Sequence, residues 1–135
     1  QQRRGFGKTY VALDDAAPDK ATRVTGFVTV CAGQVASSEL AGKRPRHPAP
    51  VLRIARLGVD TASQGQGLGR ALLAFALHLA LDFSLGFSKR VGLYAVVVDA
   101  KHEHAAAFYR SLGFVPVTDQ PLKLYLPLAT LAKTR

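Results

Sequence analysis

A glycine-rich segment in the middle of the chain is the strongest candidate for chemistry. The residues from Gln64 to Arg70 read QGQGLGR and stand between an apolar run and a long stretch with helical periodicity. The first N–H groups of a helix lack intrahelical acceptors and carry partial positive charge, and glycines let a phosphate approach the backbone. The segment is therefore a candidate diphosphate-binding loop, with Arg70 as a further positive charge. A glycine-rich turn without a ligand is the alternative.

The spacing of these glycines excludes two common phosphate motifs. A dinucleotide-binding fingerprint needs G-x-G-x-x-G in the first strand–helix unit, whereas this chain has G-x-G-x-G after three predicted strands. A P-loop needs Gly-Lys followed by Ser or Thr, and the segment contains no lysine. The loop therefore matches neither of these two phosphate motifs.

Other residues that could do chemistry give weaker signals. His102 and His104 are two positions apart, so they do not share a helix face and make poor metal ligands. Cys31 is the only cysteine, which rules out an internal disulfide and fits a reducing compartment. Asp99 and Glu103 lie near the second helix, but surface acids are usually bystanders. We therefore expect no metal and assign no general base.

Short apolar runs rich in β-branched and aromatic residues predict the strands that frame the loop. The predicted strands cover residues 7–13, 23–36, 51–59 and 91–98, and a terminal hairpin covers residues 114–117 and 122–128. Turns or loops are expected between them, at residues 14–22, 37–50 and 85–90.

Two helices are predicted between these strands. The first runs from the glycine loop to about Phe83, and the second covers residues 101–112 and ends at Gly113. Apolar residues of the first helix form two rows, so we expect it to be buried on most sides. These rows are Leu68, Leu72, Phe75, Leu79 and Phe83, and Leu73, Leu77 and Leu81.

The order of these elements predicts an α/β fold of the α+β kind. The strand–helix–strand unit at residues 51–98 implies a parallel strand pair at the centre of a mixed, mostly antiparallel sheet flanked by helices. The 135 residues are enough for one hydrophobic core, so we expect a single domain over residues 1–135.

The charge of the chain points to polyanionic partners. Eighteen Lys and Arg residues against nine Asp and Glu residues give a formal net charge of +9, which attracts nucleic acid or coenzyme A. A generally solvated basic surface is the alternative. The most apolar stretch, residues 68–85, contains Arg70, His78 and Asp82, so we expect no membrane span and a cytoplasmic protein.

Two motifs in this order resemble those of the GNAT acetyltransferases. Gln64-x-x-Gly67-x-Gly69 after a strand is similar to the family's Q/R-x-x-G-x-G/A signature. Downstream, the segment from Ala105 to Phe114 is similar to its second signature, A-x-x-[FL]-Y-x-x-x-G-F. The resemblance covers roughly residues 7–130. It implies a GNAT fold whose N-terminal strand and helices are missing here, so that the domain is N-terminally truncated.

A narrower resemblance links the chain to GNAT toxins of toxin–antitoxin pairs. The run from Pro50 to Asp60 and the ending from Leu122 to Leu131 are similar to segments of these toxins. That resemblance implies an acetyl-CoA-dependent enzyme that acetylates the α-amino group of aminoacyl-tRNA and blocks translation. It also implies a ribbon-helix-helix antitoxin as partner, and a homodimer is a further candidate assembly.

The resemblance also implies roles for particular residues. Tyr109 would donate a hydrogen bond or proton to the departing thiolate, although a packed helix aromatic is the alternative. Residues of the glycine loop would bind the diphosphate, and main-chain groups of the preceding strand would bind the pantetheine arm. The expected cofactor residues are Leu57, Val59, Gln64, Gly65, Gln66, Gly67, Leu68, Gly69, Arg70, Ala106 and Phe108. His102 stands where many family members carry Asn, which leaves the contact of that side chain open.

Candidate RNA contacts are basic residues on predicted loops, where phosphates can reach them. These are Lys43, Arg44, Arg46, Lys89 and Arg90. Two other functions remain open at this point. One is an acetyltransferase for small amines or protein amino groups, and the other is a regulatory module that binds acyl-CoA without transfer.

Overall fold

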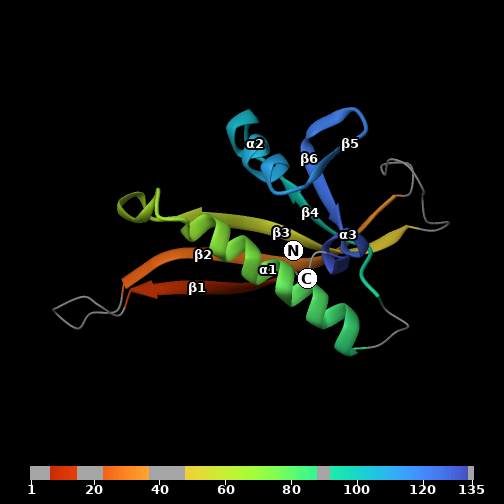
Figure 1. Cartoon of the computed structure of the whole chain (residues 1–135), viewed down its shortest axis with the longest axis horizontal. Coiled ribbons are helices and arrows are strands. Elements are labelled where there is room, and N and C mark those ends of the chain that lie inside the picture. The colour runs from red at the N-terminus through yellow and green to blue at the C-terminus, as the bar shows by residue number, and fades with distance from the viewer. Residues whose placement is uncertain (1–6, 15–22, 37–47, 88–91, 134–135) are drawn as a thin grey trace.

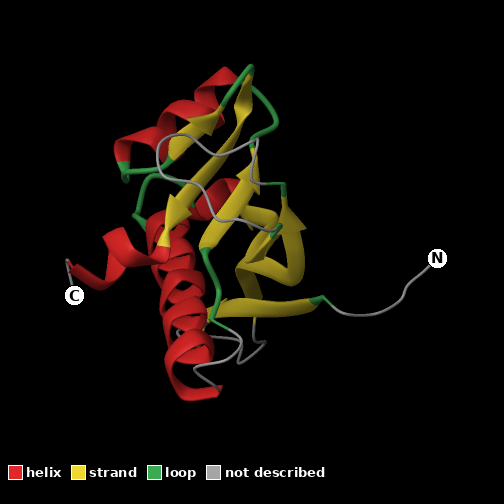
Figure 2. Ribbon diagram, turned by 90° about the vertical axis from the view of Figure 1, so that its right-hand side faces the viewer, coloured by secondary structure: helices red, strands yellow, loops and turns green. Residues whose placement is uncertain are grey.

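A computed structural model describes residues 7–14, 23–36, 48–87 and 92–133. The described chain forms a six-stranded sheet in the order β1-β2-β3-β4-β6-β5, with α1 lying along one face (Figure 1, Figure 2). The elements in chain order are β1 (Lys8–Asp14), β2 (Arg23–Val35), β3 (Ala49–Val59), the 3₁₀ turn η2 (Thr61–Ser63), α1 (Leu68–Phe87), β4 (Ala95–Asp99), α2 (Glu103–Ser111), β5 (Val115–Val117), β6 (Gln120–Pro127) and α3 (Leu128–Lys133).

The centre of the sheet confirms the predicted parallel pair. Residues 51–54 of β3 lie beside residues 95–98 of β4 in parallel, while the other neighbouring strands pair antiparallel. The crossover between β3 and β4 is α1, since parallel strands need a long connection. The four residues of β4 in this pair, Ala95–Val98, are all buried, as expected for a strand covered on both faces.

Several strand limits differ from the prediction. β3 already begins at Ala49, within residues predicted as loop, and β4 begins at Ala95 rather than four residues earlier. Tyr94, just before β4, donates its N–H to the carbonyl of Pro50 (2.8 Å). The terminal hairpin turns more tightly than expected because Asp119 adopts a positive φ of 64°, so β6 starts at Gln120. Asp14, the first residue of the turn predicted at residues 14–22, ends β1 instead. The rest of that turn and most of the loop at residues 37–50 lie outside the described residues.

The prediction that the first helix is buried on most sides is wrong. α1 extends to Phe87, beyond the predicted end and into the expected turn, and only one side of it packs on the sheet. Ala76 and Ala80 are fully buried there, whereas Phe75 is 42% exposed and makes an edge contact with Tyr10. Leucine and alanine occur all around this helix, so composition alone could not show which face meets the sheet.

Gly26 of β2 allows α1 to lie close to the sheet. A Cβ atom at this position would lie 2.9 Å from Leu72 Cδ1 and 3.1 Å from the carbonyl oxygen of Gly58. Such distances are shorter than van der Waals contact, so a side chain here would force Leu72 to shift and would crowd the β3 backbone at Gly58. The start of α1, next to the glycine loop, is thereby held against β2.

The second helix agrees with its prediction, apart from slightly shorter limits. α2 covers Glu103–Ser111, and Gly113 follows it with φ 102°, the left-handed conformation that ends a helix. The short α3 was not predicted. It buries Leu128 in the core, and six residues are too few to give a helical periodicity in the sequence.

Within the described ranges, none of the helices combines the length and the hydropathy that a membrane-spanning helix requires.

Candidate active site

The candidate site begins where β3 and β4 stop pairing. The two strands pair only as far as Ile54 and Val98. The register between β2 and β3 shifts at the next residue, Ala55, which forms a β-bulge. A bulge bends its strand, so β3 turns away from β4 beyond this point. The rest of β3, including Leu57 and Val59, therefore borders a cavity on its β4 side.

The glycine loop adopts a conformation that its sequence requires. Gly65 and Gly67 have φ values of 83° and 80°, which other residues adopt only with strain. No atom lies within 4 Å of the position that a Cβ would take at either residue, so the loop surface is open on that side. Gln64 donates its side-chain amide to the carbonyl of Val59 (3.1 Å) and ties the loop to the end of β3.

The loop ends in an open helix N-terminus. The first helical hydrogen bond of α1 runs from Ala71 N to Gly67 O (3.0 Å), so the amides of residues 68–70 precede the helical ladder. No acidic side chain lies in this first turn, and Arg70 adds a positive charge. Unpaired amides, the helix dipole and a cation together suit a phosphate or diphosphate group.

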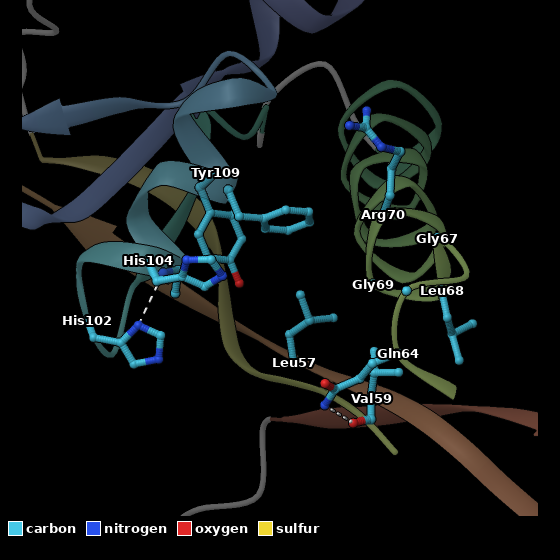
Figure 3. Close-up of a pocket in the computed structure, with 13 residues that line it drawn as sticks. Leu57, Val59, Gln64, Gly67, Leu68, Gly69, Arg70, His102, His104 and Tyr109 are labelled. Carbon is cyan, nitrogen blue, oxygen red and sulfur yellow. Dashed lines mark hydrogen bonds between the residues drawn. The ribbon is translucent and has the colours of Figure 1, made fainter. Parts of the chain in front are cut away.

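A cavity of about 530 Å³ lies between this loop and α2. Figure 3 shows α1 and the loop on one side, α2 on the other and Leu57 between them. The lining residues are Leu57, Val59, Gln64, Gly65, Gly67, Leu68, Gly69, Arg70, His102, His104, Ala105, Phe108 and Tyr109. Ten of the twelve catalytic and cofactor residues expected from the sequence are among these.

Two expected cofactor residues do not line this cavity. Gln66 lines a separate hollow on the other side of the loop, next to Arg23. Ala106 is fully buried in the core, and Ala105 takes its place on the cavity wall. The helical period could have shown this, because residue 105 lies one turn before Tyr109 on the same face.

Tyr109 occupies the cavity wall that α2 provides. It is 6% exposed, packs edge-on against Phe108 and Phe114, and directs its hydroxyl into the cavity (Figure 3). Burial raises the pKa of the Tyr109 phenol above its ordinary value. At neutral pH the group is therefore protonated and acts as a hydrogen-bond donor.

His102 and His104 also line the cavity, which the motif did not predict. His102 is the N-cap of α2, because its Nδ1 accepts a hydrogen bond from Ala105 N (3.2 Å; dashed in Figure 3). In the neutral ring this leaves the proton on Nε2. A histidine thus takes the capping role that Asn fills well, and it keeps a donor at the mouth of the cavity.

A smaller cavity of about 170 Å³ lies behind Tyr109 and shares four residues with the first. Those shared are Leu57, His102, Ala105 and Tyr109. Asp99, the last residue of β4, and Lys101, two residues further on, line only the smaller cavity. Arg53 Nη1 donates to Asp99 Oδ2 at 2.6 Å. The two cavities therefore share the wall at Tyr109 but differ in their charged residues.

The structure gives no placement for the predicted RNA contacts. Residues 37–47 and 88–91 lie outside the described ranges, and all five basic candidates fall within them. Among the described residues, no three His, Cys, Asp or Glu side chains are grouped so as to hold a metal ion.

Comparison with known proteins identifies the family. The family model of the acetyltransferase (GNAT) domain matches residues 5–116. The chain belongs to the GNAT acetyltransferase family. The fold described above, with its parallel pair between β3 and β4, is that of this family.

Relatives within the family include toxins. The chain is 36% identical over 107 residues to a tRNA-acetylating toxin of Mycobacterium tuberculosis, a match covering 77% of this chain. The chain spans only 62% of the length of that toxin.

Two solved structures extend the likeness to the fold. The toxin AtaT in complex with acetyl-methionyl-tRNAfMet has a TM-score of 0.83 at 27% identity, over 96% of this chain and 75% of AtaT. A tyrosine-to-phenylalanine variant of AtaT, bound to acetyl-CoA and to the C-terminus of the antitoxin AtaR, has a TM-score of 0.72 at 28% identity. That match covers 94% of this chain and 72% of the variant.

Proposed function

We propose that this chain is the acetyl-transferring part of a toxin that uses acetyl-CoA to acetylate the α-amino group of aminoacyl-tRNA and thereby blocks translation. One observation carries the proposal: an open helix N-terminus with two left-handed glycines faces a buried tyrosine across a single cavity. The named likeness to a tRNA-acetylating toxin and to AtaT supports the choice of acceptor.

The residues present fit acetyl-CoA. The amides of residues 68–70 and the positive charge of Arg70 suit the diphosphate, and the open space at Gly65 and Gly67 allows its close approach. The edge of β3 at Leu57 and Val59 has no β4 partner, so its main-chain groups are available to the extended pantetheine arm. We assign all of these loop and β3 residues to the cofactor site, together with two further residues that line the cavity, Gln64 and Phe108.

Acetyl-CoA supplies an acetyl thioester, whose C–S bond breaks as the bond from the amine nitrogen to the acetyl carbon forms, with one proton passing from nitrogen to sulfur. Tyr109 acts as a hydrogen-bond donor to the charge that develops on sulfur. A thiol has a pKa near 8.5 and the phenol one of about 10 before burial, so complete proton transfer from tyrosine is uphill by roughly 2 kcal/mol or more. Burial raises the pKa of Tyr109 further, which keeps it a donor.

An α-amine suits a site in which we assign no general base. Its pKa is about 7.7–8.0, so a useful neutral fraction exists at physiological pH, whereas a lysine with a pKa near 10.4 needs more help. The formal net charge of +9 favours an acceptor carried on a polyanion. The two arguments together favour aminoacyl-tRNA over peptides and polyamines.

The likeness to AtaT also supports a proposal about the binding partners of this protein. Because AtaT binds the C-terminus of an antitoxin, we propose that this protein also has an antitoxin, of the ribbon-helix-helix type, and that it acts in the cytoplasm, where charged tRNA is found. A homodimer is a further proposed assembly, which mass measurement in solution would test.

The deciding experiment incubates the full-length protein with labelled acetyl-CoA and a bulk pool of charged tRNA, with deacylated tRNA as control. We expect label on the charged tRNA alone. Label on a peptide or polyamine, with none on RNA, would replace the toxin by a small-amine or protein acetyltransferase. Binding of acetyl-CoA without transfer to any amine would indicate a regulatory module.

A further inference from the structure

The cavity behind Tyr109 contains a carboxylate whose position is held by a second residue. Asp99 is the last residue of β4 and lines this cavity together with Tyr109 and Leu57. Its Oδ2 accepts a hydrogen bond from Arg53 at 2.6 Å, and the Arg53 side chain is only 26% exposed. The Asp99 side chain is itself 61% exposed, so the ion pair favours one orientation of the carboxylate and leaves its other oxygen accessible.

The two members of this pair lie on the side of the sheet away from α1. Ile54 and Val98, their neighbours in sequence, belong to the core beneath α1, while Val97 belongs to the cluster on the opposite face. Because side chains alternate along a strand, Arg53 and Asp99 share the face of Val97. The carboxylate therefore reaches the end of the β3–β4 gap from the side opposite the glycine loop.

A second acidic residue nearby provides an internal comparison. Glu103, at the start of α2, also forms an ion pair with an arginine, Arg110. It lines neither the large nor the small cavity. Proximity in sequence makes Asp99 and Glu103 equivalent, but only Asp99 shares a cavity with Tyr109.

The charges around the small cavity limit the kind of amine that it attracts. Arg53 and Lys101 carry two positive charges against the one negative charge of Asp99. The net electrostatic attraction between this cavity and a free polycation is weak, because the attraction to Asp99 is offset by repulsion from Arg53 and Lys101. An amine attached to a phosphate-bearing group can form two favourable contacts here, because the amine contacts Asp99 while the phosphate contacts Lys101.

We propose that Asp99, fixed by Arg53, is the residue that positions the acceptor amine, and that Lys101 favours acceptors with a phosphate close to that amine. This inference rests on the proposed acetyl transfer to an amine. The carboxylate accepts an N–H hydrogen bond from the neutral amine. Asp99 is a positioning residue, because it holds the amine through a hydrogen bond and carboxylates are intrinsically much weaker bases than amines.

The test compares three variants of the full-length protein with the wild type. Asp99→Asn keeps the size of the side chain, but its single oxygen is needed by Arg53 and its NH2 group cannot accept the N–H of the amine. We therefore expect kcat/KM for charged tRNA to fall roughly 10- to 100-fold, as for a misplaced reactant. Acetyl-CoA affinity, measured by calorimetry without acceptor, should stay within about twofold, since Asp99 does not line the large cavity.

The other two variants separate positioning from a structural role. Glu103→Gln breaks the matched ion pair on α2 and should leave transfer within about twofold of wild type. Arg53→Gln removes the anchor but keeps the carboxylate, so its loss should be smaller than that of Asp99→Asn. Equal losses of activity and of Tm in Asp99→Asn and Arg53→Gln would show that the pair is structural and overturn the proposal, as would wild-type activity of Asp99→Asn.

A failure of the proposed function has a different result. If the wild-type protein labels a peptide or polyamine and no charged tRNA, the acceptor class and the role of Lys101 are wrong. The same variants are then compared with that amine. A selective loss in Asp99→Asn would still support positioning, and no loss would overturn it.

Discussion

The two cavities that meet at Tyr109 are built in different ways. The large one takes its polar wall from main-chain groups of one short segment, residues 64–70, at the start of α1. The small one takes its charges from two side chains, Asp99 at the end of β4 and Lys101 in the turn before α2. A diphosphate and a thioester are constant features of a cofactor, so a fixed backbone cradle suits them. An acceptor differs between enzymes, and side chains can change without rebuilding the loop.

This contrast explains why a motif predicts the cofactor side better than the acceptor side. Glycines at φ values of 83° and 80° cannot be replaced without strain, so the loop carries a recognisable sequence motif. Asp99 and Arg53 are 46 positions apart and meet only because β3 and β4 pair in parallel. No local pattern records that contact.

The largest effect should come from Tyr109, one of the four residues that line both cavities. Tyr109→Phe removes the hydroxyl and keeps the ring, so the edge contacts with Phe108 and Phe114 remain. We expect kcat to fall about 100-fold or more, the range for loss of a hydrogen-bond donor to transition-state charge, and growth arrest on expression to be relieved. Steady-state rates with charged tRNA measure this. Full toxicity of the variant would remove Tyr109 from the mechanism.

The pH dependence should separate the acceptor from the tyrosine. Only the neutral amine attacks, so kcat/KM should rise about tenfold per pH unit below the pKa of an α-amine, about 7.7–8.0. Because burial raises the pKa of Tyr109, its proton is lost only above its ordinary value, and no alkaline fall should occur below about pH 10. Initial rates between pH 6 and 9.5, with wild type and Tyr109→Phe, check both limbs. A fall centred near pH 8 would contradict the role of a raised tyrosine pKa.

Two glycines of the same loop offer a matched pair for the cofactor side. Gly67→Ala places a Cβ at φ 80°, which costs about 1–2 kcal/mol and should weaken acetyl-CoA binding roughly 5- to 30-fold by depleting the binding conformation. Gly69 has an ordinary φ, and an added Cβ would lie 3.8 Å from Val59 Cγ2, an ordinary contact. Gly69→Ala should therefore bind nearly as well as wild type. Calorimetry measures the acetyl-CoA affinity of both variants. Equal affinities would argue against binding of the diphosphate by the main chain of the glycine loop.

The smallest effect concerns the tie between the loop and the sheet. Gln64→Ala removes the hydrogen bond to the Val59 carbonyl, which is exposed to solvent, so acetyl-CoA affinity should fall about two- to fivefold. The KM for charged tRNA should not change. A larger change in the acceptor KM than in acetyl-CoA affinity would mean that the two cavities are coupled through β3.

The sequence by itself determined the order of the six strands and the two longer helices, the parallel strand pair and the glycine loop. Each rests on local regularities: alternating or helical apolar spacing, and glycines where φ must be positive. It also singled out Tyr109, through its position in a motif. The face of α2 that lines the cavity could in part be predicted from the sequence, because the helical period places Ala105 rather than Ala106 on the same face as Tyr109.

Only the tertiary structure decided which face of α1 is buried, where β3 bends and which acid reaches the tyrosine. Leucine and alanine surround α1, so the contact with β2, made close by Gly26, selects the buried side. The bulge at Ala55 has no sequence signature, because a register shift is a relation between two strands. Asp99 differs from Glu103 for the same physical reason: its environment is set by residues distant in the chain, which the fold alone brings together.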